Sequence, residues 1–307
     1  MLTVVNRRLI SLCSILAFAA SAVQGAESAP EATLEAAQRA FQSGDREAAL
    51  RIATEMIASN PREPNNYFLR ARFYQLMDQR ESALRDYDQL LTIAPEAHEI
   101  HYFRAVVHFL LGHIEASADD FDQLVKAQPE NMPALWQRGI VLYYAGRYEE
   151  ARKQFEANRT VNAADIENSI WHFLCLAREK GTEQARAELM PVTGDTRVPM
   201  VQLFNLFAGK GTPEAVLAAV DEAGTASEAR QGQLLYAHLY LALYYEAVGN
   251  EALRRSHLQS AFDTQLKNEY MWEVARVHLD LLNSGRLKPD GPARVEESDS
   301  KTIERTD

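Results

Sequence analysis

Residues 61–95 read PREPNNYFLRARFYQLMDQRESALRDYDQLLTIAP, and this stretch decides the fold of the chain. Pro61 and Pro95 lie 34 residues apart, and Pro129 follows at the same interval. Between the prolines, two runs of apolar residues at helical spacing are separated by a short polar turn. Because proline ends a helix, the interval predicts a pair of helices that is repeated along the chain.

The same residue types recur outward from this stretch in four successive units. One position of each first helix holds a small residue: Ala37, Ala71, Ala105 and Gly139. The turn between the helices holds Gly44, Asp78, Gly112 and Gly146. One position of each second helix again holds a small residue: Ala49, Ala83, Ser117 and Ala151. A large packing residue follows in three units, at Tyr87, Phe121 and Phe155. One helix pair cannot bury its apolar face alone, so the pairs are expected to stack.

On these positions the sequence resembles the tetratricopeptide-repeat (TPR) family. The resemblance implies an all-α fold, a right-handed solenoid of helical hairpins whose first helices line a concave face. We expect four repeats within residues 26–163.

Opposite charges recur in register on the two helices of neighbouring repeats, as Arg70 with Asp86 and Arg104 with Asp120. The pattern predicts salt bridges between the two helices of a repeat, and solvated surface charges are the alternative. In the next repeat Arg138 keeps the basic half, but Gln154 replaces the acid.

Beyond the repeats, residues 164–284 are predicted to be helical but divergent. Apolar periodicity predicts helices at 166–178, from 182, at 201–207, 213–220, 231–248 and 251–262, and a capping helix at 271–282. Residues 191–199 are expected to form a loop. Residues 285–307 are charged and poor in large apolar residues, which predicts a disordered tail.

The layout of exported TPR repeats, a divergent helical middle and a late TPR-like pair (LYLALYYEAVGNEALRRSHLQSAF) is similar to the NlpI-like family of bacterial envelope lipoproteins. That resemblance implies a dimeric, non-enzymatic adaptor that brings a periplasmic protease to cell-wall hydrolases. The chain departs from the family at Cys13, because the large Leu12 precedes it where a lipid-attachment site needs a small residue.

Residues 1–25 have the pattern of a signal peptide. Arg7 and Arg8 form a basic region, an apolar stretch follows, and small residues at Val23 and Gly25 suggest cleavage before Ala26. We therefore expect an exported protein, periplasmic or secreted, without a transmembrane segment in the mature chain. The apolar stretch is shorter than the roughly 17 residues that span a bilayer.

Charge and composition limit the classes of partner. The chain has 307 residues, 47% of them hydrophobic, and a formal net charge of -11. Nucleic acid is excluded as an expected partner, because phosphate binding needs a concentrated basic surface. A protein or peptide is the expected partner.

The TPR resemblance assigns partner contacts to the concave face. Projecting the repeat positions onto this chain gives Phe68, Arg72, Gln75, Glu99, Tyr102, Val106, Phe109, Trp136, Ile140, Tyr143 and Tyr144. The rings of Phe68, Tyr102 and Trp136 recur at one equivalent position, and aromatic rings commonly anchor interfaces. Two alternatives stay open, since the chain's own C-terminal helices or a second copy in a homodimer would also cover these rings.

Enzymatic signals are weak, and no cofactor or catalytic residue is predicted. Motifs for a nucleophilic serine, a phosphate loop and a zinc protease are missing from the sequence. Four histidines cluster at His98, His101, His108 and His113, so a His-based metal-binding protein is the less favoured alternative, because they lack the spacing of a firm metal site. Cys175 lies among large apolar residues, which favours a packing role over a nucleophilic one.

Overall fold

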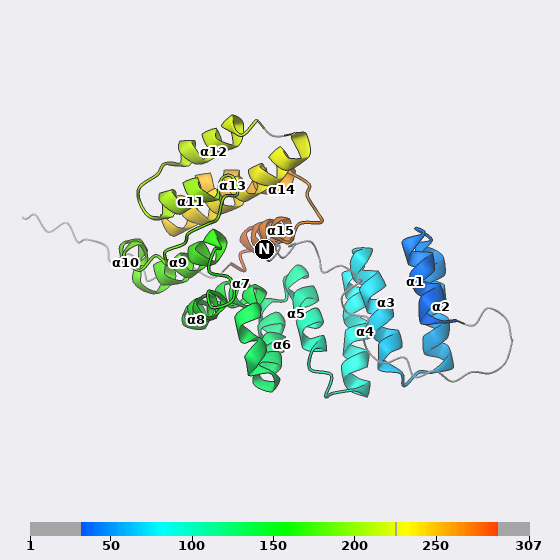
Figure 1. Cartoon of the computed structure of the whole chain (residues 1–307). Helices are drawn as coiled ribbons and strands as arrows, with labels where there is room; N and C mark the ends of the chain where they lie inside the picture. Colours follow the sequence, from blue (N-terminus) through cyan, green and yellow to red (C-terminus); the bar gives the residue numbers. More distant parts are fainter. Residues whose placement is uncertain (1–31, 225, 288–307) are drawn as a thin grey trace, which may run out of the picture.

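The computed structural model describes residues 32–224 and 226–287, and it contains helices and no strands in those ranges (Figure 1). The helices of the four repeats are α1 (Leu34–Gln42), α2 (Arg46–Ser59), α3 (Pro64–Leu76), α4 (Arg80–Ile93), α5 (Ile100–Leu110), α6 (Ile114–Ala127), α7 (Trp136–Tyr144) and α8 (Tyr148–Asn158). A 3₁₀ helix, η2 (Pro129–Ala134), precedes α7. The predicted all-α repeat fold is therefore confirmed.

The turn inside each repeat needs a backbone conformation that few residues adopt. Gly44, Gly112 and Gly146 have φ angles of 88°, 71° and 75°, in the left-handed region that favours glycine. Asp78 takes the same position with a φ of 59°. Aspartate is one of the few other residues that tolerates this conformation, which explains why the pattern accepts it.

The small residues of the first helices allow the two helices of a repeat to approach closely. Ala37, Ala71 and Ala105 are completely buried. In the fourth repeat even alanine is too large, since a Cβ atom on Gly139 would lie 2.5 Å from the Phe155 ring. The large ring of α8 therefore requires glycine on α7.

The predicted salt bridges between paired helices are confirmed. Arg70 Nη2 lies 2.7 Å from Asp86 Oδ1, and Arg104 Nη2 lies 2.7 Å from Asp120 Oδ1. Both acids are buried, with side chains 7% and 4% exposed, so these are not the solvated charges of the alternative reading. Burial raises the pKa of Asp120, but the hydrogen bonds from His101 and Arg104 outweigh this effect and lower it overall.

Each of these arginines also reaches back to the preceding repeat. Arg104 contacts Asp88 at 2.8 Å and Arg138 contacts Asp122 at 2.7 Å, while Arg70 donates to the hydroxyl of Thr54. Arg138 thus finds an acid in the repeat before it, although Gln154 replaces the acid of its own repeat. The 34-residue spacing of Thr54, Asp88 and Asp122 is visible in the sequence, so repeat counting could have found this second set.

The C-terminal part forms a second group of helices above the repeats in Figure 1. Its helices are α9 (Ile166–Lys180), α10 (Thr182–Ala187), α11 (Met200–Phe207), α12 (Pro213–Glu222), α13 (Ser227–Ala247), α14 (Glu251–Asp263) and α15 (Tyr270–Asn283). Each lies where apolar periodicity predicts a helix, and no helix interrupts residues 191–199. Gly209 and Gly249 repeat the left-handed turn, with φ angles of 72° and 75°.

The last helix, α15, contacts both the C-terminal helices and the repeats. α15 packs on α13 and α14 and also returns to contact α5, in the third repeat (Figure 1). Arg80 and Arg276 both donate to the carbonyl oxygen of Leu110, at the C-terminal end of α5. Cationic groups at this end of a helix interact favourably with its exposed carbonyls.

No helix within the described ranges is long and apolar enough to span a membrane. The predicted signal peptide, residues 1–25, lies outside the described residues. Most of the predicted tail, from residue 288 onward, also lies outside them.

Candidate functional site

The three aromatic residues predicted to line the concave face lie at equivalent positions on α3, α5 and α7. Each ring makes an edge-on contact with another ring: Phe68 with Phe103 at 5.1 Å, Tyr102 with Phe103 at 5.4 Å, and Trp136 with Tyr270 at 5.0 Å between centroids. None of the three side chains is fully buried. The three residues follow the 34-residue spacing of the repeats. Part of each ring's surface is already in contact with another ring of the same chain.

α15 covers the part of this face formed by α7 and the C-terminal end of α5. Tyr270 stacks on Phe109 at 6.1 Å, and the Tyr144 hydroxyl lies 3.1 Å from Nδ1 of His278. Five predicted partner contacts are consequently buried inside the folded chain: Val106, Phe109, Ile140, Tyr143 and Tyr144. Their assignment as exposed contacts is corrected, because the chain's own C-terminal helices cover this half, α9 and α13 at Tyr143 and α15 at Phe109 and Tyr144.

A buried carboxylate holds the covering helices in place. Glu246 on α13 accepts hydrogen bonds from Tyr143 on α7 and Arg178 on α9, both at 2.5 Å. His278 on α15 lies 2.8 Å from its second oxygen, and Arg254 on α14 lies 3.6 Å away. One side chain therefore connects five helices from both parts of the chain.

Glu246 stays ionised in this environment. Burial raises its pKa, but the nearby charges of His278 and Arg178 and the Tyr143 hydrogen bond outweigh that effect. The pKa is thereby held well below the usual glutamate range. A paired, hydrogen-bonded charge of this kind fixes the relative positions of its helices, because leaving it unpaired would be costly.

The other half of the face keeps its polar and apolar side chains partly exposed. Phe68, Arg72, Gln75 and Leu76 on α3 and Tyr102 on α5 are all half-buried, and we call these five residues the α3–α5 face. Leu76 lies outside the three hydrophobic clusters of the described chain. Glu99, also predicted as a partner contact, is exposed just before the first turn of α5.

Hydrogen bonds fix the polar groups of the α3–α5 face. Arg72 Nη1 donates to Gln75 Oε1 at 2.7 Å, and the same oxygen accepts the Tyr87 hydroxyl at 2.5 Å. The Tyr102 oxygen accepts from the Gln137 amide at 2.8 Å. Burial raises the pKa of Tyr102 to about 12, although the positive charge of Arg72 opposes the shift. The face therefore presents the oriented cation of Arg72 near the neutral phenol of Tyr102.

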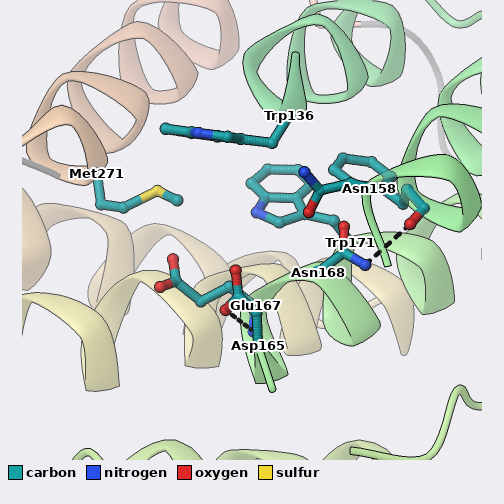
Figure 2. Close-up of a pocket in the computed structure, with 8 residues that line it drawn as sticks. Trp136, Asn158, Asp165, Glu167, Asn168, Trp171 and Met271 are labelled. Atoms are coloured by element: carbon teal, nitrogen blue, oxygen red, sulfur yellow. Dashed lines mark hydrogen bonds between the residues drawn. The ribbon is translucent and has the colours of Figure 1, made fainter. Parts of the chain in front are cut away.

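A small pocket lies where α15 meets the fourth repeat (Figure 2). Figure 2 shows Trp136, Met271 and Trp171 on one side and the carboxylates of Asp165 and Glu167 on the other. Glu167 already accepts hydrogen bonds from Tyr240 and Arg197, each at 2.7 Å. The pocket carboxylates are therefore engaged by the chain's own donors.

Two histidines of the predicted cluster, His101 and His108, lie near the same carboxylate, with His108 Nε2 3.9 Å from Asp120 Oδ2. His101 Nδ1 lies 2.6 Å from Asp120 Oδ1, so this histidine belongs to the repeat salt bridge. His108 and His113 face each other, with their Nδ1 atoms 3.4 Å apart. Across the described part of the chain, no three His, Cys, Asp or Glu side chains converge as a metal site would require.

Cys175 is expected to be unreactive in the folded protein. Its side chain is completely buried, and burial raises the pKa of the thiol well above its ordinary value. In the chain from Ala26 onward, which lacks Cys13, a thiol reagent such as Ellman's reagent should therefore modify Cys175 only after denaturant is added, with one thiol appearing along the unfolding transition. Rapid modification of a protein that keeps its native circular dichroism would contradict the packing role.

Sequence reasoning missed the residues that attach α15 to the repeats. Arg80 lies 2.5 Å from Glu273, and Glu246 binds groups from four other helices. These contacts join residues far apart in the sequence and outside the repeat register, so no periodic signal marks them.

The comparisons with known proteins agree with this architecture. The family model for tetratricopeptide repeats matches residues 77–131 and 111–158. A tetratricopeptide repeat protein from Parabacteroides merdae ATCC 43184 has a similar structure, with 18% identity, coverage of 80% of this chain and 96% of that chain, and a TM-score of 0.54. The sequence matches none of the curated proteins with which it was compared.

Two further solved structures are similar in part. MamA from Desulfovibrio magneticus RS-1 shares 16% identity over 52% of this chain and 91% of that chain, with a TM-score of 0.47. YrrB, described as a TPR protein with an unusual peptide-binding site, shares 19% identity over 73% of this chain and 97% of that chain, with a TM-score of 0.41.

Stacked helix pairs that recur every 34 residues, with a turn residue in the left-handed region of φ, define a helical-repeat protein. Proteins of this class present extended surfaces for binding. Residues 77–158 match the tetratricopeptide-repeat family, and the fold of the described chain is that of a TPR solenoid.

Proposed function

We propose that this chain is an exported TPR scaffold that binds a protein or peptide partner through the α3–α5 face. The observation that carries the proposal is the division of the concave face. α15 covers α7 and the C-terminal end of α5, whereas Phe68, Arg72, Gln75, Leu76 and Tyr102 stay partly exposed. Glu99 contributes at the edge of this face.

The chemistry of the face suits a peptide segment. Leu76 and the rings of Phe68 and Tyr102 offer apolar area, while Arg72 and Gln75 offer hydrogen bonds with fixed direction. Aromatic rings and arginine are the residue types that contribute most to protein interfaces. The similarity to NlpI-like adaptors further suggests that the partners are envelope proteases or cell-wall enzymes, met after export through the predicted signal peptide.

Replacing Leu76 by glutamate is expected to abolish partner binding without unfolding the protein. Leu76 is half-exposed and outside the core clusters, so a charge is tolerated there but would be desolvated under a partner. We expect the variant to recover at least about tenfold less partner from an envelope extract, quantified by mass spectrometry. The purified partner should then show the same loss in a direct titration.

Leu253→Glu is the matched control. Leu253 is an exposed leucine on α14, with 38% of its surface accessible, and it lies away from the α3–α5 face. This variant should recover the same partner as the wild type. Equal losses in both variants would contradict the proposed face. A dimer that the Leu76→Glu change dissociates, detected by sedimentation velocity, would instead support self-assembly through this surface.

A further inference from the structure

Arg72 lacks the carboxylate partner that most other arginines of similar burial have. Among the described residues, ten half-buried or buried arginines lie within 4.0 Å of a carboxylate. Arg72 and Arg186 have no such partner in the described chain. Since a partly dehydrated charge is normally paired in a folded protein, the unpaired guanidinium of Arg72 needs an explanation.

Its surroundings hold the guanidinium in a fixed orientation. Arg72 lies over the Phe103 ring, 5.2 Å from its centroid, and donates through Nη1 to Gln75. Its remaining nitrogens, Nε and Nη2, are not among the buried unpartnered atoms of the described chain. Since these two nitrogens also make no hydrogen bond within the described chain, both keep some access to solvent. Two such N–H groups on one edge of a guanidinium match the geometry of a carboxylate.

The charge balance identifies the kind of ligand. The chain is acidic overall, with a formal net charge of -11, yet the α3–α5 face carries the cation of Arg72 near the phenol of Tyr102, with the carboxylate of Glu99 at the edge. A carboxylate from a partner would pair with Arg72, while apolar groups on either side would lie on Leu76, Phe68 and Tyr102. A purely apolar segment would leave the guanidinium covered and unpaired, which is unfavourable.

We propose that the α3–α5 face recognises a peptide segment in which an Asp or Glu side chain is flanked by apolar residues, with the carboxylate paired to Arg72. This inference rests on the proposed function and specifies its ligand. Because Nη1 is held by Gln75, recognition uses the Nε and Nη2 edge of the guanidinium.

The test begins with a random-peptide library displayed on phage and selected on the purified protein. The same selection is made on Arg72→Gln and on Arg186→Gln, which removes the other unpaired arginine, on α10. We expect an acidic residue flanked by apolar residues to be enriched by the wild type and by Arg186→Gln, and not by Arg72→Gln. Circular dichroism verifies that all three proteins are folded.

Reversing the charge on the peptide and at Arg72 then tests whether this one ion pair determines the binding preference. A selected peptide is synthesised with blocked ends, together with a twin in which lysine replaces the acid. The wild type should bind the acidic peptide at least about tenfold more tightly than the lysine twin, and Arg72→Glu should reverse this order.

Two outcomes separate this inference from the function on which it rests. Peptides that bind the wild type and lose affinity with Leu76→Glu, but show no preference for acid, would overturn the role of Arg72 and leave the proposed binding face intact. A wild-type protein that selects no peptide would overturn both.

Discussion

Glu246→Gln is expected to lower the free energy of unfolding by about 3–5 kcal/mol, because it removes the anion that pairs with buried cationic groups. The carboxylate is completely buried, and Arg178 and Arg254 keep their charges when it is lost. Equilibrium unfolding in urea, followed by circular dichroism, measures the change. Glu55→Gln removes an exposed pair with Arg51 and should cost less than about 1 kcal/mol.

The difference in the free energy of unfolding between the wild type and Glu246→Gln should depend on pH if its origin is electrostatic. The pKa of Glu246 is lower in the folded protein than its ordinary value, so the folded state binds fewer protons there than the unfolded chain. Its contribution to stability is therefore complete above the usual glutamate pKa of about 4.3 and falls as the pH drops below it. The gap between wild type and Glu246→Gln should narrow in acid. A gap that stays constant would assign the cost to packing.

Tyr270→Ala is expected to lower the free energy of unfolding by about 3–5 kcal/mol, the usual cost of deleting a large buried ring. Tyr270 is 7% exposed and contacts Phe109 and Trp136, so its loss opens the contact between α15 and the repeats. Urea unfolding gives the free energy, and tryptophan fluorescence reports any new exposure of Trp136 to solvent.

Tyr270→Phe is the matched control for the ring. The Tyr270 hydroxyl is buried and has no hydrogen-bond partner in the described part of the chain. Its removal relieves an unfavourable buried polar group, so we expect no loss of stability and a gain of up to about 1 kcal/mol. A phenylalanine variant as unstable as the alanine variant would show that the hydroxyl, and not the ring, holds α15.

These two predictions concern the same structural feature, the attachment of α15 to the third and fourth repeats. Glu246 fixes it through charge and Tyr270 through aromatic packing. The attachment buries the half of the concave face around Phe109, Ile140 and Tyr144. Partner binding is consequently proposed for the opposite half, around Arg72 and Leu76.

The repeat and its internal geometry follow from the amino-acid sequence alone. The turn at Asp78, the small residue at Gly139 and the pairing of Arg70 with Asp86 all follow from contacts within one helix pair. Local constraints of this kind are imposed again in every repeat, so they leave a period of 34 residues that can be counted.

Which of the predicted partner contacts remain accessible depends on how the C-terminal helices pack on the repeats. Tyr102 and Tyr144 both lie on first helices and were predicted to line one continuous face, yet α15 covers only the second. The covering depends on contacts such as His278 with Glu246 and Arg80 with Glu273, between residues far apart in the chain. Each of these contacts forms once, through the path of the divergent helices, and therefore leaves no repeated pattern in the sequence.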